Sequence, residues 1–317
     1  MKINCPICNS EMTLFATTKD LQAKSSEEMY SAYECMGCNF LFQYPFWTPG
    51  ETSRFYETNY YAHTETSILP RSIRILDFFL EENFTSKMLP SFIRKKLYPY
   101  YEAIRNSKRV LDVGCGKGLF LDLMKKYNKE TYGLEPGDNA KAIALKKGHT
   151  MIDKSSIGVS GETETLKFDL ITMFQVAEHL SVQEVLKENL FSRLCDSLEH
   201  KGYLIIETPN YECKYSKDFM GDWRALELPR HLIIFSPKGI SKMLTDAGFV
   251  VKVFTRISPF DVKESLKLRY KTKSIQNYLL GFFRLCSIAP IFKKECQENH
   301  EKECSPYGDY GYYDSLR

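Results

Sequence analysis

The sequence predicts an α/β fold, a doubly wound and mostly parallel sheet that follows a cysteine-rich module and a helical segment. Three observations support this. An apolar strand at residues 110–113 runs directly into a glycine-rich turn and then into an amphipathic helix over 119–127. A second strand, 130–135, ends in an acidic residue, and the largely apolar stretch 168–174 has the composition of a buried strand. Strands that alternate with helices in this way favour a parallel sheet.

The glycine turn is the first candidate binding site. Gly114, Gly116 and Gly118 have no Cβ, so they can adopt positive φ and let a ligand approach backbone N–H groups at the start of a helix. Glu135, about 20 residues further on, is placed to accept hydrogen bonds from ribose hydroxyls. Both features predict a nucleotide-type ligand, and a dinucleotide would satisfy them equally well.

The residues beyond the turn narrow this choice. In chain order, Asp112, the glycine turn, Glu135, the strand that begins with Phe168 and Asp169, and the run 178–180 (Glu-His-Leu) resemble class I S-adenosylmethionine-dependent methyltransferases. The resemblance covers roughly residues 108–256 and implies a Rossmann-like fold. It also implies that Asp112 and the three glycines surround the methionine part of the cofactor, that Glu135 holds its ribose, and that Gln175 lies beside it.

Four of the ten cysteines have the spacing of a metal site. Cys5 and Cys8 form one Cys-x-x-Cys pair, and Cys35 and Cys38 form another. Two such pairs complete the tetrahedral four-thiolate shell of structural zinc, which leaves no open position for catalysis. Redox thiols or an iron–sulfur cluster are the alternatives. The intervening segment predicts a small zinc ribbon, with strands at 12–15 and 30–34, that folds only with its metal.

The chain divides into four predicted parts: a zinc ribbon and aromatic linker (1–60), a helical cap (61–107), a methyltransferase core (108–260) and a C-terminal helical extension (261–317). Aromatic residues of the linker are expected to pack the ribbon onto the core. The alternative places Tyr60 at the mouth of the active site as a substrate contact. The segment 66–107 has near-helical apolar spacing broken by prolines, and it predicts a lid over the cofactor cleft.

Methyl transfer is an in-line displacement that also removes a proton from the acceptor, so a base is required near the methyl group. His179 follows the predicted strand 168–174, at the sheet edge where ligands bind in such folds. The resemblance to sugar C-methyltransferases implies that His179 is that base and that Glu178 supports it. Val176 stands where those enzymes have a tyrosine, which speaks against C-methylation. The alternative is a structural histidine that begins a helix over 181–198.

A second histidine, His231, lies in the long loop that follows the predicted strand 202–207. Loops of this length in compact domains are commonly functional. Trp223, Arg230 and His231 are similar to a segment that borders the substrate cleft in bacterial enzymes of polysaccharide biosynthesis. Arg230 is therefore a candidate to bind a phosphate or carboxylate of the substrate, and His231 is a second candidate catalytic group. The alternative is a loop packed by Trp223, with His231 bonded to backbone.

The apolar segment 275–292 predicts a helix that closes over the cleft or forms a homodimer contact, with a peripheral membrane helix as the alternative. Arg284 and Pro290 interrupt it too strongly for a transmembrane span. No stretch after it has the pattern of the seventh strand that this fold usually contains.

Composition fits a cytoplasmic enzyme. No signal peptide is apparent, and cysteines in a reducing compartment serve as metal ligands or buried thiols. The net charge of +3 over 317 residues gives no indication of nucleic-acid binding. The leading hypothesis is methyl transfer from S-adenosylmethionine to a small molecule, a sugar or nucleotide-linked sugar of polysaccharide or metabolite biosynthesis. An RNA methyltransferase that grips a hairpin with its zinc ribbon, and a non-catalytic zinc-ribbon binding protein, are the alternatives.

Overall fold

The computed structural model describes residues 2–22, 27–52, 55, 77, 80, 100–158, 166–252, 255–256, 259–270, 287–288 and 291–293. Tyr60, most of the predicted cap at 61–107 and the tail after residue 293 lie outside the described residues. The predicted roles of the cap and of Tyr60 therefore stay predictions, as does the division into four parts.

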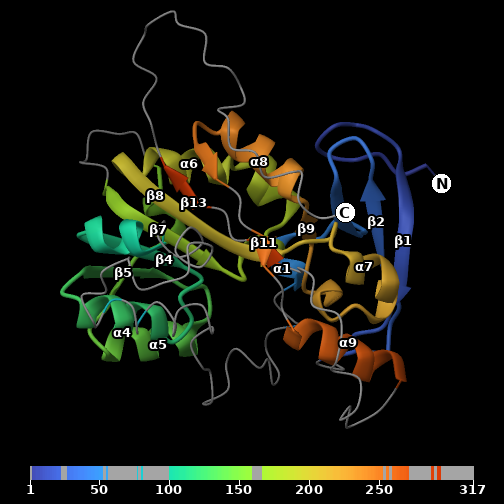
Figure 1. Ribbon diagram of the computed structural model, residues 1–317, viewed down its shortest axis with the longest axis horizontal. Coiled ribbons are helices and arrows are strands. Elements are labelled where there is room, and N and C mark those ends of the chain that lie inside the picture. Colours follow the sequence, from blue (N-terminus) through green and yellow to red (C-terminus); the bar gives the residue numbers. More distant parts are fainter. Residues whose placement is uncertain are drawn as a thin grey trace, which may run out of the picture.

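The central sheet contains five parallel strands in the order β6-β5-β4-β7-β8. They are β4 (Arg109–Val113), β5 (Glu130–Leu134), β6 (Thr150–Met151), β7 (Phe168–Phe174) and β8 (Leu198–Pro209). Helices α4 (Leu119–Lys126) and α5 (Asp138–Lys146) lie on one side of the sheet, and α6 (Leu190–Asp196) and α8 (Pro237–Asp246) on the other (Figure 1). The doubly wound prediction is confirmed.

The position of strand β4 determines where a ligand can bind. Its chain neighbour β5 pairs on one side and the later strand β7 on the other, so the strand order reverses at β4. Ligands of open α/β sheets bind at the carboxyl ends of the strands at such a reversal. The packing beneath is apolar, because Leu111 is fully buried in β4 and α4 buries Leu121 and Met124. The core therefore holds the turn after β4 at the carboxyl ends of the parallel strands.

The antiparallel edge of this sheet corrects the predicted helix at 275–292 for the residues of it that the structure describes, 287–288 and 291–292. Strands β12 (Ser287–Ile288) and β13 (Ile291–Lys293) both pair antiparallel with β8, in one register: Ile288 lies opposite Thr208 and Ile291 opposite Ile205. Strands β10 (Val250–Lys252) and β11 (Thr255–Arg256) pair with β13 and β12. Strand β13 is the seventh strand of this sheet, which the sequence pattern did not reveal. It covers backbone N–H and C=O groups that the edge of β8 would otherwise expose.

A second sheet joins the N-terminal module to the core. Strands β1 (Met12–Thr18), β2 (Tyr30–Cys35) and β3 (Phe40–Tyr44) are antiparallel, and β9 (Ile233–Phe235) is the fourth strand (Figure 1). The two predicted ribbon strands are confirmed and are longer than expected. In the β3–β9 pair, Phe40 lies opposite Phe235 and Phe42 opposite Ile233, and all four side chains are buried. The predicted boundary at residue 60 is therefore crossed by a shared sheet.

Aromatic side chains fill the space beneath this second sheet. Trp47 stacks on Phe55 with ring centroids 5.2 Å apart, and Tyr30 meets both rings edge-on. Trp223 and Leu226, from the loop after β8, are buried in the same cluster. The packing interpretation of the aromatic linker is supported for these residues.

The helix predicted over 181–198 is wrong in its extent. A π-helical turn at Gln183–Lys187 is followed by Asn189, whose φ of 48° is left-handed, and α6 begins at Leu190. Strand β8 already starts at Leu198. Further α-helices are α1 (Pro49–Thr52), α7 (Lys214–Phe219) and α9 (Pro259–Tyr270), and residues 100–106 are also helical. No helix in the described part of the chain is long and apolar enough to cross a membrane.

Candidate active site and a four-cysteine cluster

The three glycines of the turn after β4 have different surroundings. All have positive φ: 71° at Gly114, 52° at Gly116 and 76° at Gly118. A Cβ added to Gly114 would lie 2.4 Å from Cγ2 of Val176, and one added to Gly118 would lie 2.8 Å from Cδ2 of His149. A Cβ on Gly116 would meet no described atom within 4 Å. Internal packing thus requires the first and third glycines, whereas the second borders open space.

Glu135 lies directly across from that second glycine. The Gly116 N–H donates to Oε2 of Glu135 at 2.9 Å, and the Gly137 N–H donates to Oε1 at 2.8 Å. The carboxylate is therefore fixed at the end of β5 beside the open face of the turn. A carboxylate held there suits two ribose hydroxyls, and bare backbone at Gly116 suits a closely approaching cofactor. These residues fit S-adenosylmethionine.

Asp112 supports the turn from below. Its side chain is buried at the end of β4, and the Thr172 hydroxyl donates to its Oδ1 at 2.7 Å. Burial raises the pKa of Asp112 to about 7, and the nearby Glu135 carboxylate adds to the effect although the Thr172 bond opposes it. Asp112 is thus a buried carboxyl group that accepts a hydrogen bond from one hydroxyl.

The next predicted residues follow strand β7, at the same carboxyl ends of the parallel strands. Gln175 is exposed with a left-handed φ of 57°, and its N–H donates to the Glu207 carbonyl at 2.7 Å. Val176, the next residue, is the side chain that packs against Gly114. The turn after β7 and the glycine turn after β4 are therefore in contact.

His179 ends a 3₁₀ turn (Ala177–His179) that follows this contact. Its Nδ1 lies 3.1 Å from the Arg230 carbonyl oxygen. A carbonyl oxygen only accepts hydrogen bonds, so Nδ1 carries the proton and the lone pair is on Nε2. Burial lowers the pKa of His179, although the Glu227 carboxylate opposes this shift. The imidazole is therefore neutral near pH 7 and can accept a proton at Nε2.

The ring of His231 packs edge to face against the ring of His179. The ring centroids are 4.7 Å apart and the planes cross at 78°. Nδ1 of His231 donates to the Ala225 carbonyl at 2.8 Å, so its lone pair is also on Nε2. Burial, together with the adjacent His179, lowers the pKa of His231 to about 3. The structure thus brings both candidate histidines together.

Glu178 lies beside this pair, because one of its carboxylate oxygens and one ring nitrogen of each histidine all lie within 4.8 Å of one another. Its side chain is fully buried, the Thr208 hydroxyl donates to Oε2 at 2.9 Å, and Oε1 has no partner among the described atoms. Burial raises the pKa of Glu178 to about 8. The Arg230 backbone carbonyl contacts Nδ1 of His179, and the expectation that Glu178 supports His179 stays a prediction.

The two predicted substrate residues of the long loop lie inside the protein. Arg230 is 1% exposed, and its Nη1 and Nη2 contact the two carboxylate oxygens of Asp20 at 3.0 and 2.9 Å. Its Nε donates to Glu227 at 3.1 Å. Trp223 is 2% exposed within the aromatic cluster. The guanidinium is paired with the protein's own carboxylates, so this geometry favours a structural role for Arg230 and packing for Trp223.

Sequence reasoning missed Asp20 and Glu227. Glu227 precedes Arg230 by three residues, a spacing that could have indicated an ion pair. Asp20 lies in the connection between β1 and β2, far from Arg230 in the chain, and no local pattern connects the two.

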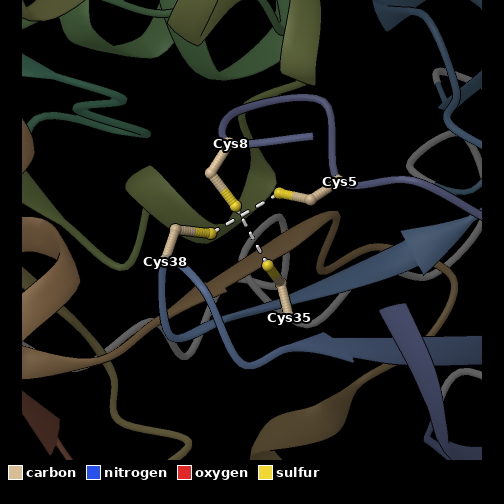
Figure 2. Close-up of side chains that lie close together, drawn as sticks. All are labelled: Cys5, Cys8, Cys35 and Cys38. Carbon is tan, nitrogen blue, oxygen red and sulfur yellow. Dashed lines mark hydrogen bonds between the residues drawn. The ribbon is translucent and has the colours of Figure 1, made fainter. Parts of the chain in front are cut away.

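The four predicted zinc ligands converge on one point (Figure 2). The sulfurs of Cys5 and Cys38 are 3.5 Å apart, those of Cys8 and Cys35 are 3.3 Å apart, and all four lie within 4.8 Å of one another. Sulfurs at zinc-bonding distance from one ion are separated by about 3.8 Å, so the donor set and spacing fit a structural zinc ion.

The two cysteine pairs have matching backbone turns. Asn9 follows the first pair with φ of 59°, and Asn39 follows the second with φ of 57°. The Asn9 N–H donates to the Cys5 carbonyl and the Asn39 N–H to the Cys35 carbonyl, both at 2.9 Å. Asparagine tolerates this left-handed conformation better than most residues, which explains its place after each pair.

The strand order, the glycine turn and the fixed Glu135 carboxylate together define the class: an S-adenosylmethionine-dependent methyltransferase with a Rossmann-like fold. A comparison with protein families agrees, because residues 80–252 match the family described as "Methyltransferase domain". This match spans more than half of the chain, and the protein belongs to that family.

Two curated relatives are ubiquinone biosynthesis O-methyltransferases. The mitochondrial protein of Candida albicans is 28% identical over 171 residues, which cover 49% of each chain. The protein of Bradyrhizobium diazoefficiens is 28% identical over 170 residues, which cover 50% of this chain and 65% of the relative. The chain thus spans about half to two thirds of these relatives. A solved methyltransferase of Archaeoglobus fulgidus is 24% identical, with a TM-score of 0.44 over 68% of this chain and 99% of that one.

Proposed function

We propose that this protein transfers a methyl group from S-adenosylmethionine to a small-molecule acceptor, and that His179 removes the acceptor's proton. The observation that carries the proposal is the tautomer of His179: its Nδ1 is bonded to the Arg230 carbonyl, so Nε2 is the basic atom. The turn that holds His179 also packs Val176 onto the glycine turn. A base with a depressed pKa thus lies at the same sheet edge as the proposed cofactor residues.

The bound cofactor would supply a methyl group activated by a positive sulfur. As an acceptor hydroxyl takes this methyl group and the cofactor leaves as a neutral thioether, His179 would accept the hydroxyl proton at Nε2. In this scheme Gly116 and Glu135 hold the cofactor, so binding alone aligns its methyl group with the acceptor oxygen.

The positive charge gained by His179 has a fixed counter-charge. Burial alone would raise the pKa of Glu227, but His231, Arg224 and Arg230 lower it to about 2, so its carboxylate stays ionised. This carboxylate faces both histidines and stabilises the imidazolium. His231 stays neutral beside it, because its pKa is lowered to about 3.

The acceptor that we propose is a sugar or nucleotide-linked sugar of polysaccharide or metabolite biosynthesis, as the sequence resemblance implies. A phenolic hydroxyl is the second candidate, because two relatives are named as O-methyltransferases of ubiquinone biosynthesis. Both candidates place the methyl group on oxygen. Val176, which stands where sugar C-methyltransferases have a tyrosine, agrees with an oxygen acceptor.

We further infer that the four-cysteine cluster holds one structural zinc ion. Four thiolates fill the tetrahedral shell, so the metal would act on folding and not on the methyl-transfer step. None of the seven described cysteines forms a disulfide. Reduced cysteines agree with the proposed cytoplasmic location, and the proposed homodimer contact still has to be sought by measuring the mass in solution.

The test is a methyl-transfer assay with labelled S-adenosylmethionine and purified full-length protein. Three acceptor panels are offered: nucleotide-linked sugars, dihydroxyphenols and structured RNA. Label in a sugar product supports the proposal, whereas label in RNA with a steep salt dependence overturns it in favour of the RNA alternative. Failure to bind S-adenosylmethionine in calorimetry would overturn the cofactor assignment itself.

A further inference from the structure

We propose that Asp20, in the N-terminal module, is a positioning residue for His179 and acts through Arg230. This inference rests on the proposed function of His179 as the base. It gives the N-terminal module a part in catalysis beyond covering the core.

The contact path is short and buried. Asp20 is 2% exposed, and both of its carboxylate oxygens bind the guanidinium of Arg230, at 2.9 and 3.0 Å. The backbone carbonyl of the same arginine accepts the Nδ1 proton of His179 at 3.1 Å. Arg230 thus donates two hydrogen bonds to Asp20, and its backbone carbonyl is the acceptor that selects the tautomer of His179. A bidentate pair restrains both position and orientation.

The chain on either side of Arg230 is fixed by the same module. The Leu232 N–H donates to the Glu178 carbonyl at 2.7 Å, and the Leu232 carbonyl accepts from the Gln43 N–H at 3.0 Å. Strand β9 then pairs with β3. Before Arg230, the side chain of Gln22 donates to the Arg224 carbonyl at 2.5 Å. The N-terminal module therefore holds the loop from both ends, and Asp20 holds the arginine between them.

Charge balance points to the same role. Asp20 and Glu227 carry two negative charges, and Arg224 and Arg230 carry two positive charges in one network, which is buried except at the partly exposed Arg224. Removal of the Asp20 charge would leave this network one unit positive beside His179. The groups that face His179 are Glu178, His231, Glu227 and Arg230. A net positive network disfavours the imidazolium and lowers the pKa of His179 further.

The experiment observes the imidazole nitrogens of His179 directly and needs no methyl acceptor. Full-length protein labelled with ¹⁵N at its six histidines is examined by two-bond ¹H–¹⁵N NMR, and the His179 signals are assigned by their loss in His179→Gln. In the wild type we expect one Nδ1–H tautomer. In Asp20→Asn we expect the two nitrogen shifts to move toward each other, because the tautomers then mix. Asp20→Glu should restore most of the separation.

Glu34→Gln is the matched control. Lys217 and Glu34 form another ion pair between the N-terminal sheet and the segment after β8, at 2.7 Å. Its loss weakens the same interface without touching Arg230, so the His179 signals should stay at their wild-type positions. Wild-type signals in Asp20→Asn, or the same change in Glu34→Gln, would overturn the inference.

A second variant covers a failure of Asp20→Asn to fold. Arg230→Lys keeps the charge and the backbone carbonyl but cannot form the two-pronged contact, and it should mix the tautomers in the same way. Calorimetry with S-adenosylmethionine checks folding, because the cofactor residues lie on other elements. With an acceptor in hand, kcat should fall roughly 10- to 100-fold at unchanged KM for the cofactor. A His179→Gln variant with normal turnover would refute the proposed base, whereas normal tautomers in Asp20→Asn would refute only this inference.

Discussion

His179 and His231 meet edge to face with ring centroids 4.7 Å apart, and each donates its Nδ1 proton to a backbone carbonyl. The two rings come from different loops, one after β7 and the other after β8. Because both protons are committed to carbonyls, both lone pairs are on Nε2. In this arrangement Nε2 of His179 is the atom that the proposed proton transfer uses.

Gly116→Ala should weaken S-adenosylmethionine binding at least tenfold, because the added methyl group enters the open space beside Glu135. Gly114→Ala is the matched comparison, since both residues have positive φ and incur a similar strain. In Gly114→Ala the methyl group meets Val176 at 2.4 Å, so thermal stability should fall more than in Gly116→Ala. Calorimetry and thermal unfolding measure the two effects, and equal cofactor affinity in wild type and Gly116→Ala would contradict the assignment.

Glu135→Gln should reduce cofactor affinity by roughly 10- to 100-fold, because charge-assisted hydrogen bonds to the ribose become neutral ones. The control is Glu130→Gln, at the other end of β5. Glu130 is exposed and pairs with Arg109 at 3.1 Å. Its replacement should leave affinity unchanged, since a surface ion pair contributes little to stability. Equal losses in both variants would indicate a general effect on β5.

His179→Gln should slow turnover by roughly 10²- to 10⁴-fold while cofactor binding stays normal. The pH profile carries further information. The neutral imidazole is the active form, and burial holds the pKa of His179 below its usual 6.5. The acid limb of kcat should therefore lie below pH 6.5. A midpoint above 6.5 would be inconsistent with a buried base.

His231→Gln should make the protein more resistant to acid. The folded pKa of His231 is about 3, below the usual 6.5 of an unfolded chain. Between these values the unfolded state binds the extra proton, so the free energy of unfolding falls as the pH is lowered from 6.5 toward 3. The slope reaches about 1.4 kcal/mol per pH unit. Chemical denaturation at pH 7 and pH 5 should show a smaller loss in His231→Gln than in the wild type.

Removal of the proposed zinc ion should loosen the N-terminal sheet. Both tryptophans of the chain report on it, because Trp47 stacks on Phe55 and Trp223 is buried in the same cluster. A strong chelator, or Cys8→Ser, should shift tryptophan emission to longer wavelength. Metal analysis should find one zinc ion per chain in the wild type and in Cys195→Ser, a buried cysteine of α6 outside the cluster. Zinc retained in Cys8→Ser would contradict the four-thiolate site.

Several features could be predicted because their causes are local. The apolar run at Arg109–Val113, positive φ at three glycines and the spacing of each cysteine pair depend on a few neighbouring residues. The seventh strand could not be predicted in this way. Residues 287–288 and 291–293 have no strand pattern of their own, and they become strand because the edge of β8 offers them unpaired backbone groups.

The sequence by itself determined the parallel sheet, the glycine turn with its acidic partner and the convergence of four cysteines, since these follow from periodicity, φ preferences and ligand spacing. Tertiary structure alone decided what Arg230 does. A side chain that suits a substrate phosphate binds Asp20 instead, because folding brings a carboxylate from a distant connection into the same buried space. Burial makes that pairing obligatory, since an unpaired charge there would be severely destabilising.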